Sequence, residues 1–492
     1  MLAVAMVAAS HAPTAQERGL GEPPWQAFIA AAGPDQRQAQ AAREEIAARW
    51  RDGHAAMIVD VARFLPSPRG PRAAEDPGSQ TLDDPVDEER SGGTVARDDF
   101  PVLPSRERQG ADTRRRLTQF LERQTRNRFG DNLRAWRRWM WALPYAPHQD
   151  YAAFKAELYS KIDPRFRAFF PSRVRATIRL DEIDWGGVPV NGIPPLRSPK
   201  NVPAAQAPWL RDGHIVFGIV VNGDARAYPK RILAWHEMAT DRLGGVDLTV
   251  VYCTLCGTVI PYESGTAGRR FTFGTSGLLY RSNKLMFDEE TRSLWSSLEG
   301  VPVVGSLVDS GLQLPFHAVV TTTWGEWRRE HPSTTVLSLE TGYKRDYAEG
   351  AAYRDYFATD QLMFEVPAAD SRLKNKDEVL VLRPEIIGKD ASPVAISVDR
   401  LRREPLYAFE AGGRGFLVVT SKGGANVVYE RGAHTFRARS ADGILRDTNG
   451  QRWAETADAL VSEAGVRLAR VPAHRAFWFG WVAQYPETVL LK

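Results

Sequence analysis

The chain contains only two cysteines, and both lie in the stretch "LTVVYCTLCGTVIPYE", residues 248–263. Cys253 and Cys256 are separated by two residues, and Gly257 follows at once. A Cys-x-x-Cys-Gly turn between two strand-like runs directs both sulfurs toward one point, and glycine adopts the backbone conformation that closes the turn. The chemistry open to such a pair is metal binding, thiol–disulfide redox chemistry or a structural cross-link.

Metal binding by this pair needs further ligands, because a structural zinc site takes four. We expect His236 to be the third ligand, and Met286 and Asp288 are weaker candidates to complete the set. Two thiolates, one imidazole and a thioether favour copper over a hard cation, and thiolate and imidazole ligands also suit zinc. The leading hypothesis from the sequence is therefore a copper or zinc site.

Two alternatives remain open beside the metal site. A dithiol oxidoreductase needs only the cysteine pair, with one sulfur attacking and the other resolving, although a hairpin lacks the helix N-terminus that activates thioredoxin-like sites. A non-catalytic binding module would use the pair as a structural disulfide. Its ligand would bind the polar side chains of the following segment, which are Ser276, Arg281, Ser282 and Asn283. Catalytic residues stay unknown, and so does whether the protein is an enzyme.

The chain also resembles itself in two places. "TVVYCTLCGTVIPYESG" (249–265) matches "LVVTSKGGANVVYERG" (417–432), and "TTTWGEWRREHPSTTVL" (321–337) matches "AFWFGWVAQYPETVLL" (476–491). Five such blocks in the same order indicate a duplication. The alignment places Thr420 opposite Cys253 and Gly423 opposite Cys256, so the second copy lacks the thiols. We expect any chemistry in the first copy, and the framework tryptophans Trp295, Trp324 and Trp327 in the core.

These patterns predict an α+β protein with a helical N-terminal region followed by a duplicated, mainly β module. A segment rich in Pro, Gly and charge interrupts the helical region and is typical of a disordered linker. A few short helices are expected within the first β module, such as one at residues 230–243. The predicted parts are a helical region at 19–170 with its linker at 66–114, a first β-rich module at 171–345, a connector at 346–375, and a second, degenerate module at 376–492.

Bulk properties exclude some functions. The 64 Lys and Arg residues are balanced by 60 Asp and Glu residues, so no basic face indicates nucleic-acid binding. No segment approaches the roughly 18 apolar residues that a membrane span requires. Residues 1–18 combine an apolar run with small residues and a polar end, which is typical of a signal peptide. We therefore expect a periplasmic or otherwise exported protein, whose cysteines would meet an oxidising compartment in the periplasm. Its protein or small-molecule partner is not identified by the sequence.

Several stretches resemble a known family. They are "NGDARAYPKRILAWHEMATDRLGG", "VVYCTLCGTVIPYE", "FTFGTSGLLYRSNKLMFDEETRSLW" and "TTWGEWRREHPSTTVLS". They look like the bacterial and archaeal proteins grouped as domain of unknown function 3179, where the thiol motif is similar to Tyr-Cys-Pro-Leu-Cys-Gly; this chain has Thr254 at the proline position. The resemblance runs from about Ile178 to the C-terminus and is strongest over 213–340. It implies no activity, and because members often look exported, it implies export.

Overall fold

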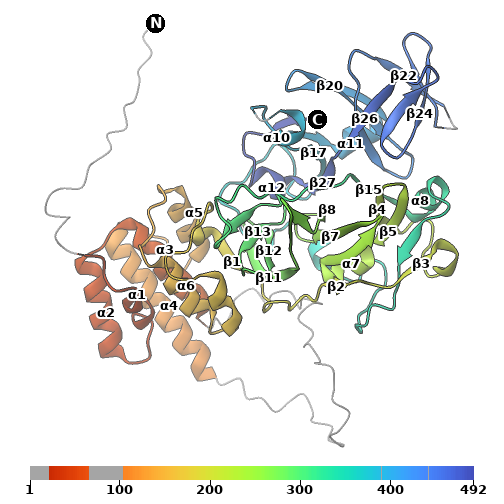
Figure 1. The fold of residues 1–492 in the computed structure, drawn as a ribbon. Coiled ribbons are helices and arrows are strands. Elements are labelled where there is room, and N and C mark those ends of the chain that lie inside the picture. Colours follow the sequence, from red (N-terminus) through yellow and green to blue (C-terminus); the bar gives the residue numbers. More distant parts are fainter. Residues whose placement is uncertain (1–20, 66–103, 389, 441–442) are drawn as a thin grey trace, which may run out of the picture. The chain divides into compact units, whose positions relative to one another are not determined.

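The computed structural model describes residues 21–65, 104–388, 390–440 and 443–492, which form two compact units. The first unit is helical and contains the described residues up to Leu158 together with Pro171–Arg173. The second unit is mainly β and contains Tyr159–Phe170 and Val174–Lys492. The predicted helical N-terminal region and mainly β C-terminal region are thereby confirmed (Figure 1). The predicted signal peptide at 1–18 and residues 66–103 of the predicted linker lie outside the described residues.

The helical unit is built around a buried helix, α3, which packs against α4 and α5. The helix α4 begins at Pro104, so residues 104–114, which composition assigned to the linker, are helical instead. Proline suits the first position of a helix, and buried Leu117 and Leu121 anchor the later turns. The helices are α1 (Trp25–Ala30), α2 (Gln36–Ala48), α3 (Ala55–Phe64), α4 (Pro104–Thr125), α5 (Leu133–Ala142) and α6 (Tyr151–Tyr159).

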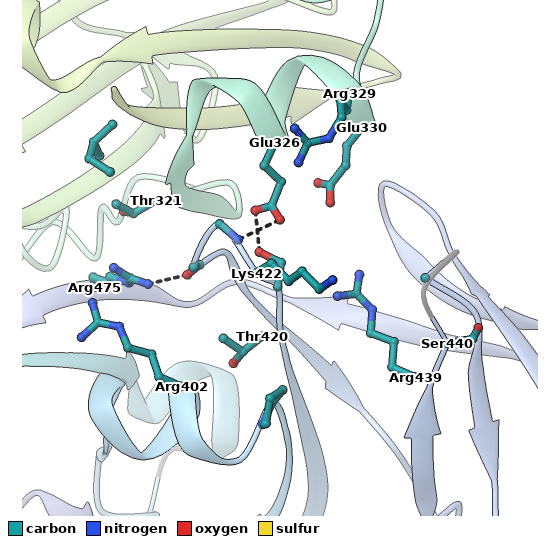
Figure 2. A pocket seen from close by; sticks show the side chains of 16 residues that line it. Thr321, Glu326, Arg329, Glu330, Arg402, Thr420, Lys422, Arg439, Ser440 and Arg475 are labelled. Atoms are coloured by element: carbon teal, nitrogen blue, oxygen red, sulfur yellow. Dashed lines mark hydrogen bonds between the residues drawn. The ribbon is translucent and has the colours of Figure 1, made fainter. Parts of the chain in front are cut away.

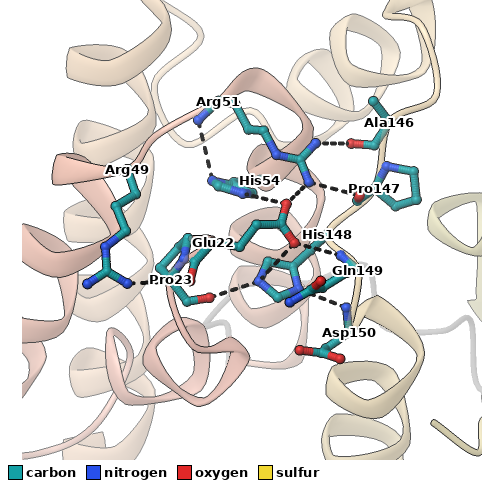
Figure 3. A network of polar contacts seen from close by, with 10 residues as sticks. All are labelled: Glu22, Pro23, Arg49, Arg51, His54, Ala146, Pro147, His148, Gln149 and Asp150. Atoms are coloured by element: carbon teal, nitrogen blue, oxygen red, sulfur yellow. Dashed lines mark hydrogen bonds and ion pairs between the residues drawn. The ribbon is translucent and has the colours of Figure 1, made fainter. Parts of the chain in front are cut away.

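A polar network centred on Glu22 stabilises this unit (Figure 3). Its carboxylate pairs with Arg51 and lies 3.6 Å from Nε2 of His54 and 3.5 Å from Nε2 of His148. In both rings Nδ1 accepts a backbone N–H, from Arg51 and Asp150 respectively, so Nε2 carries the proton, which His148 donates to the carbonyl of Pro23 at 2.8 Å. Burial lowers the pKa of His54 to about 3 and also lowers that of His148, so both rings are neutral at pH 7. The network ties the residues before α1 to those before α6.

The first half of the β unit contains four sheets. Their strand orders are β15-β4-β5-β16-β3, β2-β6-β7-β8, β1-β11-β12-β13-β14 and β10-β9. The elements are β1 (Ile183–Trp185), β2 (Leu196–Arg197), β3 (Asn201–Pro203), β4 (Ile215–Val221), β5 (Asp224–Pro229), α7 (Lys230–His236), β6 (Met238–Leu243), β7 (Val246–Cys253), β8 (Thr258–Glu263), β9 (Gly265–Thr266), β10 (Arg269–Arg270), β11 (Phe273–Tyr280), β12 (Asn283–Asp288), β13 (Leu294–Ser296), β14 (Pro302–Val304), β15 (Val319–Thr323), α8 (Trp324–Glu330) and β16 (Thr335–Leu337).

The second half of the β unit contains two sheets, with strand orders β27-β17-β18-β28 and β19-β20-β21-β26-β25-β24-β23-β22. The elements are α9 (Arg354–Phe357), β17 (Glu378–Leu382), α10 (Pro384–Ile387), β18 (Val394–Ser397), α11 (Val398–Arg403), β19 (Leu406–Ala411), β20 (Arg414–Thr420), β21 (Asn426–Glu430), β22 (Phe436–Arg439), β23 (Leu445–Asp447), β24 (Arg452–Glu455), β25 (Ala459–Ser462), β26 (Arg467–Val471), β27 (His474–Phe477), α12 (Trp478–Val482) and β28 (Val489–Leu491).

The two halves share one pairing pattern. In the first half, β4 is antiparallel to β15 and β5, and β5 is parallel to β16. In the second half, β17 is antiparallel to β27 and β18, and β18 is parallel to β28. The framework residues Trp295, Trp324 and Trp327 are buried, which confirms that prediction.

Two boundaries differ from the sequence-based expectation. The helix expected at 230–243 ends at His236, because Glu237 adopts a left-handed conformation with φ 55°, and the following residues form β6, which pairs with β7. Residues 159–170 belong to the β unit rather than the helical unit. Phe169 packs against Phe287 of β12 with ring centroids 5.2 Å apart, and the Asp163 carboxylate accepts the N–H of Val190. In both cases long-range packing overrides local helical pattern.

Gly218 in β4 faces the ring of Trp327, and a Cβ built there would lie 2.2 Å from Cζ3 of that ring. Trp327 is held in place because its Nε1–H donates to Oγ1 of Thr334 at 2.9 Å. We expect Gly218→Ala to lower the free energy of unfolding by about 1–3 kcal/mol in urea denaturation. Gly213→Ala is the control, because no atom lies within 4 Å of its added Cβ. Equal unfolding midpoints for the two variants would contradict this prediction.

Candidate functional site

The two sulfurs lie at a hairpin tip. Strand β7 ends at Cys253, β8 begins at Thr258, and these two residues form the last pair of the ladder. The N–H of Cys256 donates to the carbonyl of Cys253 at 3.2 Å, and Gly257 closes the turn with φ 64°. Both cysteines are free and buried, and their Sγ atoms share a hydrogen bond at 2.8 Å. The strand–turn–strand geometry and the role of the glycine therefore follow the sequence pattern.

A second hairpin tip supplies an acceptor to this pair. Between β11 and β12, Arg281 and Ser282 have φ values of 48° and 64°, a conformation that favours Asn and Gly in two-residue turns. Arg281 pairs with Glu182 at 2.5 Å, and Nδ2 of Asn283 donates to the carbonyl of Gly480 at 2.9 Å. These contacts hold the strained turn, whose Ser282 carbonyl accepts the thiol of Cys256 at 3.2 Å.

The two thiols are electrostatically unequal. Burial opposes ionisation of Cys253, but the hydrogen bond with Cys256 and the backbone N–H groups of Lys284 and Cys256 outweigh it, so the pKa of Cys253 is lowered. Burial raises the pKa of Cys256 well above its usual value, and the neighbouring Cys253 raises it further. The first proton of the pair therefore leaves from Cys253, and the second is strongly retained.

A buried ion pair lies beside the thiols. Nζ of Lys284 in β12 is 2.7 Å from Oε2 of Glu237, and only 6% and 9% of these two side chains is exposed. The hydroxyl of Tyr353 donates to the other oxygen of Glu237 at 3.0 Å. A cavity of about 40 Å³ is bounded here by Glu237, Lys284, Tyr353 and Leu255. The backbone N–H of Lys284 also faces the sulfur of Cys253, so one residue contacts both the cavity and the thiol that ionises first, although neither cysteine lines the cavity.

The predicted third ligand, His236, is engaged elsewhere. Its Nδ1–H donates to the carbonyl of Pro194 at 2.9 Å, and its Nε2 accepts the hydroxyl of Tyr347 at 2.6 Å. Burial lowers the pKa of His236 to about 4, so the ring is neutral at pH 7. Neither ring nitrogen contacts a sulfur, so the structure does not bring His236 together with the cysteine pair.

The remaining predicted residues also have internal partners. Asp288 caps a turn, accepting from the N–H and hydroxyl of Thr291 at 2.6 and 2.8 Å and from Nε1 of Trp295 at 2.8 Å. Met286 packs in the core with Trp295, and the hydroxyl of Ser276 donates to the carbonyl of Leu285 at 2.5 Å. Within the described ranges, no group of three or more His, Cys, Asp and Glu side chains is arranged to hold a metal ion.

Sequence reasoning missed several residues of the site. Lys284 is a lone cation in an apolar strand, "NKLMF", which was the available signal for a buried ion pair. Tyr353 and Tyr356 come from the predicted connector at 346–375, and the hydroxyl of Tyr356 donates to the carbonyl of Leu255 at 2.8 Å. The connector therefore supplies two tyrosines that contact the site. In the sequence, the aromatic residues of this segment were its one visible sign.

Comparison with known proteins gives one match. The family model described as "Protein of unknown function (DUF3179)" matches residues 190–488, a range that contains both cysteines, Glu237 and Lys284. No curated protein and no solved structure matches the chain. No helix of the described residues is both long enough and apolar enough to cross a membrane.

Proposed function

The chain belongs to the DUF3179 family of proteins of unknown function, and from this premise we propose that its first β module is a dithiol redox centre. Cys253 and Cys256 pass between two thiols and one disulfide. The observation that carries the proposal is the hydrogen bond at 2.8 Å between two free, buried sulfurs. A small approach of the two sulfurs is enough to reach disulfide bonding distance, about 2.05 Å.

The unequal pKa values support a division of labour. The thiolate is the nucleophile in thiol chemistry, and the lowered pKa of Cys253 favours that residue for the attack. Cys256, with its raised pKa, keeps its proton and serves as the resolving thiol. This arrangement uses the pair alone and needs no further residue type from the sequence.

The burial of both thiols and the small size of the cavity at Lys284 support a small oxidant. A volume of about 40 Å³ holds a few atoms rather than a protein thiol or a peptide. Hydrogen peroxide fits this chemistry. The Cys253 thiolate attacks one oxygen and becomes a sulfenic acid as the O–O bond breaks and the second oxygen leaves as water after protonation. The Cys256 sulfur then displaces the sulfenic oxygen as a second water, forming the disulfide, which a thiol reductant returns to the dithiol.

Metal binding by the pair is the second candidate, and the geometry supports it less. Two thiolates on one tetrahedral zinc ion would lie about 3.8 Å apart, given Zn–S bonds of about 2.3 Å. The sulfurs are 2.8 Å apart, and His236 is held by Pro194 and Tyr347. A metal ion would therefore require the turn to open and further ligands to move.

The test compares the reduced protein with the variant Cys253→Ser/Cys256→Ser. After treatment with equimolar hydrogen peroxide, we expect the natural protein to lose both titratable thiols and to become two hydrogens lighter by intact mass. A bulky aromatic disulfide should react with the native fold at least about tenfold more slowly than with the unfolded chain, because both thiols are buried. The double-serine variant should show no change with either reagent.

The same reduced sample should be analysed for metal. We expect zinc and copper well below one equivalent after incubation with either ion and desalting. Stoichiometric metal that disappears in the double-serine variant would contradict the redox proposal and favour the metal site. Thiols that survive excess peroxide would contradict it as well and leave the pair as a structural brace.

We also infer that the β unit is a duplicated module, as the internal repeat predicts. The shared strand pairing supports this, and so do matched tryptophan contacts. Nε1 of Trp327 donates to Thr334 and Nε1 of Trp481 donates to Thr488, each at 2.9 Å. Nε1 of Trp295 donates to Asp288, and its counterpart Trp453 donates to Asp447.

Contacts between the two copies support the duplication independently. A Cβ on Gly480 in α12 would meet Cβ of Cys256 at 3.0 Å, so the thiol turn packs on the helix of the second copy. A Cβ on Gly423 would meet Oε2 of Glu326 in α8 at 2.4 Å, so the thiol-free turn packs on the helix of the first copy. Glu326 and Gly480 occupy the same position of the repeat, "WGEW" and "WFGW". Each turn therefore faces the other copy's helix.

A further inference from the structure

We propose that the cleft between α8 and the β20–β21 turn binds a small multivalent anion carrying carboxylate or phosphate groups. The cleft has a volume of about 1030 Å³ and is lined by both copies of the β module. Its walls carry five cations and two carboxylates (Figure 2). The charged residues are Arg329, Arg402, Lys422, Arg439 and Arg475, with Glu326 and Glu330.

Two of the cations, Arg329 and Lys422, are exposed and form no ion pair among the residues that the structure describes, although the charge of Arg329 acts on Glu330. In Figure 2 the ammonium group of Lys422 and the guanidinium group of Arg439 point toward one another across the cleft. Nε of Arg439 is buried and lacks a hydrogen-bond partner among the described residues. Cations directed at one another repel unless an anion lies between them, and a guanidinium group binds carboxylate or phosphate with paired N–H groups.

The two carboxylates of the cleft neutralise its five cations only in part. The carboxylate of Glu326 already accepts hydrogen bonds within the protein. Its donors are the hydroxyls of Thr322 at 2.6 Å and Ser421 at 2.5 Å and the N–H of Gly423 at 2.9 Å. Glu330 is exposed at the end of α8; partial burial of its carboxyl and the charges of Glu326 and Glu455 raise its pKa to about 7, against the opposing charges of Arg439 and Arg329. Near neutral pH, Glu330 therefore carries only part of a negative charge.

The other cations are held in place by ion pairs. Arg475 lies 3.1 Å from Glu378 and also donates to Asn426, and Arg439 lies 2.6 Å from Glu455. These contacts fix the direction of the side chains without filling the cleft. A ligand that meets preoriented guanidinium groups loses less conformational entropy than one that must order them. The cleft volume of about 1030 Å³ is similar to that of a small-molecule binding site.

The cleft lies at the position of the second copy that corresponds to the thiol turn of the first. This correspondence rests on the proposed duplication, whereas the anion site rests on the charges alone. In the second copy, Gly423 replaces a thiol-bearing residue and Lys422 extends from the same turn. Anion binding and dithiol chemistry are therefore separable by experiment.

The test is isothermal titration calorimetry of the full chain at low ionic strength, with citrate and inorganic phosphate as probes. The test variant is Arg329→Gln/Lys422→Gln, which removes the two cations that hold no ion pair among the described residues. We expect its dissociation constant for the bound probe to rise at least about tenfold, because two charge-assisted contacts are lost. Lys422→Arg should keep most of the affinity. Arg446→Gln removes an exposed cation outside the cleft and is the matched control.

Each outcome decides the proposal. Binding of both probes with loss in the double variant supports a site for the shared anionic chemistry. Binding of citrate alone identifies a polycarboxylate, and binding of phosphate alone identifies a phosphate ester as the ligand class. No heat with either probe at millimolar concentration, or equal affinity in the double variant and Arg446→Gln, would overturn it. The double-serine variant of the thiol turn should bind the probes unchanged, so failure of the dithiol proposal is recognised separately.

Discussion

We expect replacement of Cys256 by alanine to slow the reaction of Cys253 with hydrogen peroxide at pH 7 by about tenfold or more, and replacement by serine to preserve most of the rate. The reason is the hydrogen bond between the two side chains, which is the leading cause that lowers the pKa of Cys253 against the opposing effect of burial. A serine hydroxyl at this position can turn from the Ser282 carbonyl to donate to the Cys253 thiolate, and alanine has no such donor. Each pKa unit changes the thiolate fraction about tenfold when the pKa lies above the working pH.

The measurement is the rate of peroxide consumption under single-turnover conditions as a function of pH. Neither variant can form the disulfide, so both should stop at the sulfenic acid, trapped with a dione reagent and seen by mass. Cys253→Ser should be inert. Thr254→Val is the control for disturbance of the turn, because the buried hydroxyl of Thr254 has no hydrogen-bond partner among the described residues. Identical pH profiles for the alanine and serine variants would refute the role of the hydrogen bond.

Replacing Lys284 by methionine is expected to lower the free energy of unfolding by about 3–5 kcal/mol, because it leaves the buried carboxylate of Glu237 without its counter-charge. The hydroxyl of Tyr353 remains as a donor but carries no charge. Adding Glu237→Gln to the Lys284→Met variant should restore part of the lost free energy of unfolding. A neutral pair costs less to bury than a lone charge. Urea denaturation of the natural protein, both single variants and the double variant measures the coupling.

A surface ion pair provides the matched control. Lys200 and Glu340 lie 2.6 Å apart, but 54% and 71% of their side chains is exposed. Lys200→Met should therefore change the free energy of unfolding by no more than about 1 kcal/mol. A loss in Lys284→Met as small as in Lys200→Met would show that the inner pair is hydrated and would contradict its assigned burial.

The ion pair also links stability to thiol chemistry. The negative charge of Glu237 raises the pKa of Cys253, against the net lowering by its other neighbours. Glu237→Gln is therefore expected to move thiolate formation to lower pH, while it lowers stability. The stability loss follows from the unpaired charge of Lys284, and the change in pKa follows from removing a carboxylate charge near a buried sulfur.

Local pattern was enough for the features that depend on a few neighbouring residues. The Cys-x-x-Cys-Gly spacing predicted the hairpin turn, because a tight turn between two strands needs the positive φ that Gly257 adopts. The tryptophans shared by the two repeated segments were predicted to lie in the core, and they are buried. Large apolar side chains at matching positions are favoured in the core because burial removes their surface from water. The family resemblance was confirmed as well, because it rests on contiguous motifs that can be read directly from the sequence.

The tertiary structure alone decided which side chains meet the sulfurs. His236 is the imidazole that the sequence offered to the pair, but Tyr347, 111 residues further on, takes its free nitrogen. Glu237 receives Tyr353 from 116 residues away and Lys284 from a strand of another sheet. These partners depend on how the sheets pack and on the free-energy cost of burying an unpaired charge. Neither can be read from neighbouring residues in the sequence. By itself, the sequence determined where the two thiols are and how they are turned toward each other. The packing around them decided that a buried Glu–Lys pair, instead of a third metal ligand, acts on the sulfurs.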